Sequence, residues 1–96
     1  MDQQSQSIVV EEVRLQYNLQ EDRLLLSDHF TLPVISAFLR VFFTRMKRYD
    51  YPVLFVDLDG LSGLDSAGVT ALQYLKNELQ KKGIELELKG GNNATQ

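Results

Sequence analysis

Two stretches in the first third of the chain have the hydrophobic pattern of β-strands. Over residues 13–19 every second side chain is hydrophobic, which is typical of a strand with one buried face: Val13, Leu15, Tyr17 and Leu19. After the polar residues 20–22, the run 23–27 contains three consecutive leucines and predicts a second, short strand. Together the two segments predict a β-hairpin.

From Thr31 the hydrophobic spacing becomes helical. Hydrophobic side chains recur three and four positions apart between Ile35 and Met46, which predicts an amphipathic helix that Tyr49 to Pro52 ends. Thr31 is the expected N-cap, and Pro33 is acceptable in the first helical turn.

A second helix is predicted from Ser66 to about Lys82. Asp65 is a favourable N-cap, and Gly83 stands where a left-handed glycine often ends a helix. The hydrophobic side chains expected on its buried face are Val69, Leu72, Leu75 and Leu79.

Two further strands flank the second helix. Residues 53–58 are hydrophobic except for Asp57, which predicts a strand buried on both faces. A loop containing Gly60 and Gly63 is expected after it, and residues 84–88 alternate as a last strand. The order is β-β-α-β-α-β, so we expect an α/β fold with helices packed on a mixed sheet, in which the last two strands are parallel.

The length of 96 residues suits one domain. We expect a flexible N-terminal tail over residues 1–12, a folded domain over 13–90, and a linker or truncated end over 91–96. No run reaches the roughly 18 apolar residues that span a bilayer, and the start does not resemble a signal peptide, so we expect a cytoplasmic protein.

Composition excludes several classes of function. With no cysteine and only one histidine, His29, the chain is unsuited to disulfides, thiolate zinc sites and a Ser-His-Asp triad. A net charge of -3 argues against general nucleic-acid binding. We expect no catalytic residue, no metal and no cofactor.

The segment 54–68 carries the most specific motifs. Its Asp57-Leu58-Asp59-Gly60 resembles the opening motif of haloacid dehalogenase-like phosphatases, which would make Asp57 a nucleophile and Asp59 an acid/base beside magnesium. Leu61 departs from that family's threonine, and few residues remain downstream to complete such a site. This phosphatase is the remote alternative.

The same segment resembles more fully the STAS family, the domains of sulfate transporters and anti-sigma factor antagonists. The matching residues are Asp57-Leu58, Leu61, Leu64, Asp65-Ser66 and Gly68, followed by the helix and by Gly83-Ile84-Glu85-Leu86. The resemblance extends from about Val13 to Leu88 and includes the order of elements. The chain stops soon after its last predicted strand, whereas STAS domains continue into another helix and strand, so we expect the last family elements to be missing.

The STAS resemblance implies a non-enzymatic, regulatory domain that works by protein–protein contact. In similar domains the serine after the aspartate accepts a phosphate from a kinase, and Ser66 holds that place. The residues that the resemblance places in partner binding are Asp59, Leu61, Ser62, Leu64, Asp65, Ser66 and Gly68.

Two branches of the family remain open. The run Leu25 to Leu32 resembles the STAS domains of Mla-type phospholipid ABC transporters, which would make the partner a permease or ATPase at the cytoplasmic face of the inner membrane, with only indirect membrane contact. The run Asp65 to Gly68 resembles the phosphorylation motif of anti-sigma factor antagonists, whose partner is an anti-sigma kinase. An exposed sheet edge or the hydrophobic first helix would also suit a homodimer.

Overall fold

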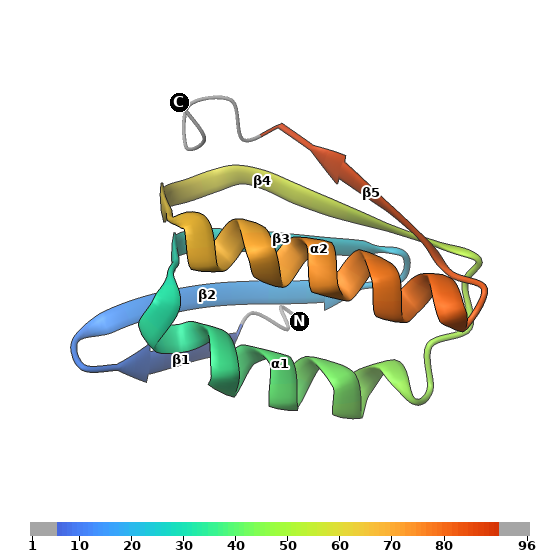
Figure 1. Cartoon of the computed structure of the whole chain (residues 1–96), viewed down its shortest axis with the longest axis horizontal. Helices are drawn as coiled ribbons and strands as arrows, with labels where there is room; N and C mark the ends of the chain where they lie inside the picture. Colours follow the sequence, from blue (N-terminus) through green and yellow to red (C-terminus); the bar gives the residue numbers. More distant parts are fainter. Residues whose placement is uncertain (1–5, 91–96) are drawn as a thin grey trace.

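Five strands form one sheet whose spatial order follows the chain, β1-β2-β3-β4-β5 (Figure 1). This computed structural model describes residues 6–90. The first three strands are antiparallel, and β3, β4 and β5 are parallel, which confirms the predicted α/β class with a mixed sheet. The elements are β1 (Gln6–Val10), β2 (Val13–Gln20), β3 (Arg23–Phe30), α1 (Leu32–Met46), β4 (Val53–Leu64), α2 (Ser66–Lys81) and β5 (Glu85–Lys89).

The first strand corrects the prediction of a flexible tail over residues 1–12. Gln6–Val10 pairs antiparallel with β2, and the Tyr17 hydroxyl donates a hydrogen bond to Gln6 Oε1 at 2.8 Å. The turn consists of Glu11 and Glu12, which have positive φ angles of 53° and 69°. A tight hairpin turn of this kind usually contains asparagine or glycine, so the sequence Glu11-Glu12 does not indicate a hairpin. The folded part therefore begins before residue 13, while residues 1–5 and the predicted end 91–96 lie outside the described residues.

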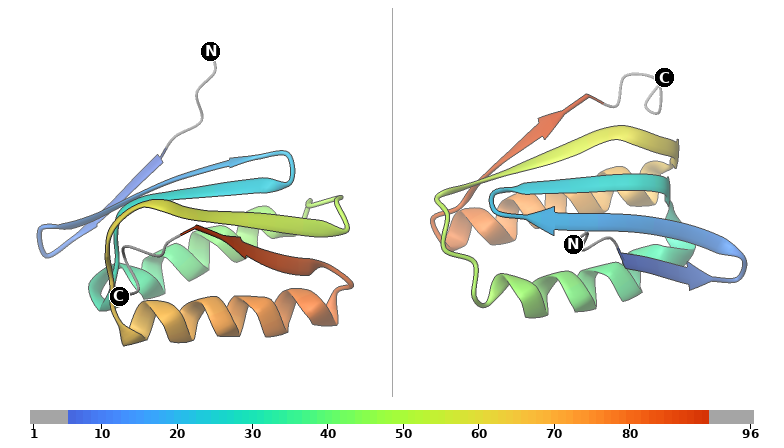
Figure 2. Two further views of the ribbon diagram at one scale, coloured as in Figure 1. Left: turned by 90° about the horizontal axis from the view of Figure 1, so that it is seen from above. Right: turned by 180° about the vertical axis from the view of Figure 1, so that it is seen from behind.

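Both helices cover the same face of the sheet, and no described helix covers the other (Figure 2). The buried side chains of α1 follow helical spacing: Val34, Ile35, Phe38, Phe42 and Met46. In α2 the buried residues are Gly68, Ala71, Leu72, Leu75 and Leu79. The core lies between these stripes and the inward-facing hydrophobic residues of the strands.

Aromatic packing explains most of the hydrophobic excess of α1. The ring of Phe38 lies 5.5 Å from that of Tyr17 and 5.3 Å from those of Phe30 and Phe42, measured between centroids. Phe43 also packs against the core and contacts the ring of Tyr74 on α2. These contacts join α1 to the sheet and to α2.

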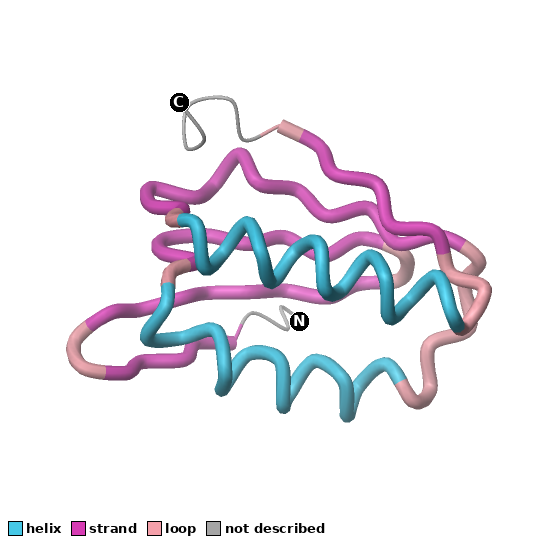
Figure 3. Tube along the Cα trace, viewed as in Figure 1, coloured by secondary structure: helices cyan, strands magenta, loops and turns pink. Residues whose placement is uncertain are grey.

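The strand β4 is longer than predicted and contains the residues that were expected to form a loop. Its register against β3 shifts twice, between Leu25 and Ser27 and between Asp28 and His29 of β3, and at each shift β4 advances one residue further than β3. These shifts are β-bulges, and the end of the strand is visibly kinked in Figure 3.

The bulges also explain the spacing of the leucines in β4. Before the first bulge, inward-facing residues are two apart, as between Val56 and Leu58. Each bulge adds one residue, so the next inward-facing side chains come three apart, at Leu61 and then Leu64. The motif Leu-x-x-Leu-x-x-Leu is thus a strand with two extra residues.

Candidate functional site

Asp65 lies between β4 and α2 and holds the starts of both helices. Its Oδ1 accepts a hydrogen bond from the backbone N–H of Gly68 at 2.8 Å, which confirms the predicted N-cap. Its Oδ2 accepts another from the backbone N–H of Leu32, the first residue of α1, at 3.1 Å. The Gly68 bond above all, with the Leu32 bond, lowers the pKa of Asp65 below the ordinary value of an aspartate.

The start of α1 depends on Asp65 more than on its own cap residue. Thr31 holds the N-cap position as predicted, but its side chain makes no capping hydrogen bond. The carboxylate of Asp65 instead receives the N–H of Leu32. The sequence contains no local signal of this bond, because its two partners are far apart along the chain.

Ser66 is the first residue of α2 and is exposed. The N–H groups of a first helical turn point outward and favour negative charge. A phosphate on this hydroxyl would therefore change the surface without entering the core.

Two of the predicted partner-binding residues lie beneath the surface. Leu61 is only 7% exposed and belongs to the core, and Gly68 is buried against the end of β3. A Cβ atom on Gly68 would collide with the carbonyl oxygen of Phe30 and come within 2.7 Å of Leu64 Cδ1. Leu61 and Gly68 thus support the surface around Asp65 from the interior of the domain, and Leu64 is half-buried.

The two aspartates of the phosphatase-like motif lie at the first bulge. Asp57 Oδ1 accepts a hydrogen bond from the backbone N–H of Asp59 at 2.9 Å, as expected for a carboxylate that stabilises the following backbone. The carboxylate of Asp59 lies against the backbone of Gly90, just after β5. Within residues 6–90, no group of three or more His, Cys, Asp or Glu side chains is arranged to hold a metal ion.

Two hydrophobic side chains are exposed beside Asp65. Leu32 is 67% exposed and Val69 is 47% exposed. Val69 was predicted on the buried face of its helix, but it lies at the rim of that face, where spacing alone does not separate rim from core. We define the docking edge as Leu32, Ser62, Asp65, Ser66 and Val69, which together offer hydrophobic, hydroxyl and acidic groups.

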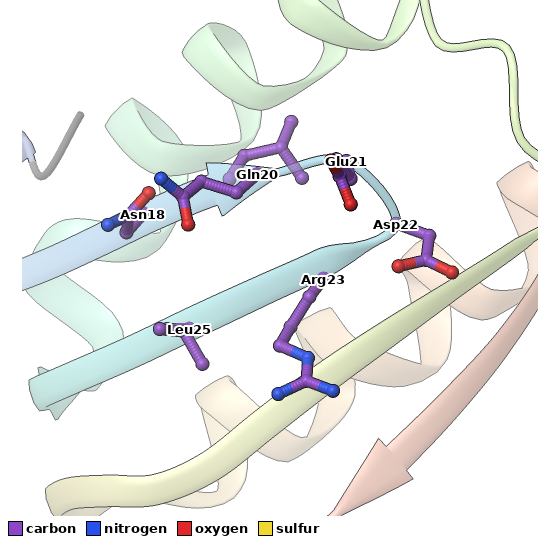
Figure 4. A pocket seen from close by; sticks show the side chains of 7 residues that line it. Asn18, Gln20, Glu21, Asp22, Arg23 and Leu25 are labelled. Atoms are coloured by element: carbon purple, nitrogen blue, oxygen red, sulfur yellow. The ribbon is translucent and has the colours of Figure 1, made fainter. Parts of the chain in front are cut away.

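A hollow lies around the β2–β3 turn, at the end of β3 opposite to the docking edge (Figure 4). It is lined mainly by polar side chains, including Asn18, Glu21, Asp22 and Arg23. None of the residues predicted to bind a partner lies there, so the docking edge and this hollow are separate surfaces.

The described residues contain no helix that is both long enough and apolar enough to cross a lipid bilayer.

Comparison with known proteins identifies the family. The family model of the STAS domain matches residues 9–96, and a comparison with curated proteins finds no match. The match extends from within β1 to the end of the chain, and includes the strand with two bulges, Asp65 and both helices. The chain belongs to the STAS domain family, whose members are regulatory and protein-interaction domains.

Proposed function

We propose that this chain is a non-enzymatic docking domain of an Mla-type ABC transporter for phospholipids, bound or fused to the permease at the cytoplasmic face of the inner membrane. The observation that carries the proposal is the arrangement around Asp65. One carboxylate joins the starts of α1 and α2, and Leu32, Ser66 and Val69 remain exposed around it. A rigid surface of this composition suits a protein partner.

The position of the run Leu25 to Leu32 supports the transporter branch. This run resembles transporter-linked STAS domains, and it forms most of β3 and the entry into α1. Phe30 is fully buried, which anchors the entry, whereas Leu32 points its side chain into solvent. Exposed hydrophobic residues on a rigid support are typical anchors of an interface.

Copurification with an Mla-type permease–ATPase complex tests this proposal. We expect Leu32→Asp to abolish copurification, since it places a charge in the interface, and to preserve the fold, since an acidic residue suits a helix start. Val9→Asp is the matched control, because Val9 is 61% exposed on the edge strand β1, which β2 and β3 separate from β4 and Asp65, and binding should persist. Undiminished binding of the Leu32 variant would refute the proposed docking edge.

A second candidate is an anti-sigma factor antagonist switched by phosphorylation of Ser66. The observation that favours it is the exposure of this hydroxyl directly after the capping Asp65. A phosphate would add about -1.5 to -2 charges beside Asp65 and repel an acidic partner surface.

Incubation with a candidate anti-sigma kinase, followed by intact mass and peptide mapping, distinguishes the two functions. The switch requires one phosphate on Ser66, and none on the control residue Ser36, which is also exposed but lies within α1. Ser66→Asp should fold normally and lose the partner, whereas Ser36→Asp should keep it. Absence of phosphate on Ser66 counts against the antagonist and leaves the transporter proposal intact.

A further inference from the structure

The strand β5 is an edge of the sheet (Figure 1). It pairs in parallel with β4 on one side, and no strand formed by residues 6–90 pairs with its other side. Leu88 is 51% exposed, although Leu86, two residues earlier on the same side of the strand, is buried. An edge that presents backbone groups and a hydrophobic side chain is a template for another strand.

The direction of each backbone group on β5 follows from its pairing with β4. The N–H of Glu85 donates to the carbonyl oxygen of Pro52 at 3.0 Å, and Glu85 is in register with Val53. In a parallel ladder, alternate residues direct both backbone groups to the same neighbour. Glu85, Glu87 and Lys89 therefore face β4, and the N–H and C=O groups of Leu86 and Leu88 face outward.

We propose that this edge pairs antiparallel with β5 of a second copy of the chain, around a two-fold axis at Glu87. Leu86 then lies opposite Leu88 of the second copy, twice by symmetry, and all four outward groups of each strand find partners. A register displaced by two residues in one direction would instead require Gly90, whose positive φ of 71° leaves the strand conformation. Displacement in the other direction would require Ile84, which precedes β5 and whose N–H already donates to the carbonyl oxygen of Leu79.

The charges of β5 complement one another in this register. Glu85 lies opposite Lys89 of the second copy at both ends of the paired segment, on the sheet face that the helices leave open. Lys89 is already held on that face, with its ammonium 5.2 Å from the ring centroid of Phe55. The other edge strand, β1, has no charged residue, so the complementarity is specific to β5.

The opposite face of β5 adds a hydrophobic contact. Leu86 and Leu88 line a groove between α2 and the sheet together with other hydrophobic side chains, including Leu58, Leu64, Val69 and Leu72. Pairing brings the leucines of the second copy to this groove and reduces the exposure of Leu88. The repulsion between the two Glu87 carboxylates at the axis opposes association.

Cysteine trapping tests the register, and the absence of native cysteine keeps the experiment simple. In Glu87→Cys the two thiols meet at the axis as a non-hydrogen-bonded pair, with Cα atoms about 4.5 Å apart, which suits a disulfide. The control Glu85→Cys lies on the same strand and face, but its two copies are offset by roughly 13 Å along the strands. We expect a disulfide-linked dimer under mild oxidation for Glu87→Cys alone.

Sedimentation of the wild-type 96-residue chain over a concentration series measures the association itself. Glu87→Gln should tighten the dimer severalfold, and Lys89→Glu should weaken it by roughly tenfold, because it places like charges opposite each other twice. The double change Glu85→Lys with Lys89→Glu should restore association. A monomer at millimolar concentration, equal trapping at residues 85 and 87, or no rescue by the double change would overturn the proposal.

Discussion

The Asp65 carboxylate accepts a hydrogen bond from the backbone N–H of Leu32, which lies 33 positions earlier in the chain. This bond joins the start of α1 to the start of α2, which Asp65 caps through Gly68. Two helix starts bring two positive dipole ends close together, and one negative charge between them stabilises both. The surface around Asp65 is therefore a consequence of how the two helices begin.

Two substitutions of Asp65 should distinguish how much each of its two hydrogen bonds contributes to stability. Asp65→Ala loses both hydrogen bonds and should lower the free energy of unfolding by about 1–2 kcal/mol, the range of a lost N-cap. Asp65→Asn can still cap Gly68 with its amide oxygen but presents an NH2 group in place of the second acceptor, so it should cost less. Chemical denaturation measures both. Equal losses would mean that the Gly68 cap, which Asn retains, contributes nothing, and an Asp65→Asn variant as stable as the wild type would mean that the Leu32 bond contributes nothing.

The same carboxylate predicts an acid dependence of stability. Because folding lowers the pKa of Asp65, its ionised form favours the folded state. This contribution is complete above the unfolded-state pKa of about 3.9 and is lost as the pH falls through the lower folded pKa. The difference in unfolding free energy between wild type and Asp65→Asn should therefore narrow between pH 5 and pH 2. If this difference stays constant with pH, Asp65 stabilises the fold through packing and not through its charge.

Gly68→Ala should be destabilising although alanine is the better helix former. The new Cβ would meet the carbonyl oxygen of Phe30, a backbone atom that has little room to move. We expect a loss of about 1–3 kcal/mol, against a gain of about 1 kcal/mol from helix propensity alone. Thr70→Ala, an exposed change in the same helix, is the control and should stay within about 0.5 kcal/mol. Thermal or urea unfolding shows whether Gly68→Ala lowers or raises the free energy of unfolding.

The environment of Tyr49 predicts that the stability of the fold decreases at alkaline pH. Its hydroxyl donates a hydrogen bond to the carbonyl oxygen of Val53 at 2.7 Å, and burial, with the nearby Asp22 and Tyr51, raises its pKa to about 12. Because the neutral phenol is favoured in the folded state, its contribution is complete below the ordinary value of 10.0 and is lost as the pH rises toward about 12. Absorbance titration should contain a late phenolate transition near pH 12 that Tyr49→Phe removes, while Tyr17, whose pKa burial also raises, keeps its own late transition.

The helices and the last four strands could be predicted from the pattern of their hydrophobic residues. The expectation that β4 is buried on both faces was wrong, because both helices cover the same face of the sheet and residues 53–58 alternate between half-buried and buried. The strand β1 was missed because its turn, Glu11-Glu12, lacks the residues that usually allow positive φ angles. Gly60 and Gly63 predict a loop at the end of β4, because glycine favours flexible backbone. In the structure both glycines have ordinary φ angles and allow close approach to β3, where a Cβ would come within 2.9 Å of Leu26 O or 2.6 Å of His29 Nδ1.

Within the site, local contacts were easier to predict than distant ones. The cap of Gly68 by Asp65 lies within four residues and has a known sequence signature. The bond from Leu32 depends on two crossovers that bring the helix starts together, which no spacing along the chain indicates. The burial of Leu61 likewise depends on a bulge that is visible only in the pairing with β3.

The two extra residues of β4 also set where α2 begins. Deleting one residue, such as Ser62, would remove one bulge and turn Leu64 toward solvent. Deleting the extra residue of each bulge would restore the inward direction of Leu64. It would also shorten the strand by roughly 6–7 Å, which would draw Asp65 away from Leu32. The number of residues between Leu58 and Asp65 is thus constrained by the contact between Asp65 and Leu32. This segment should tolerate substitutions at its exposed positions far better than any insertion or deletion.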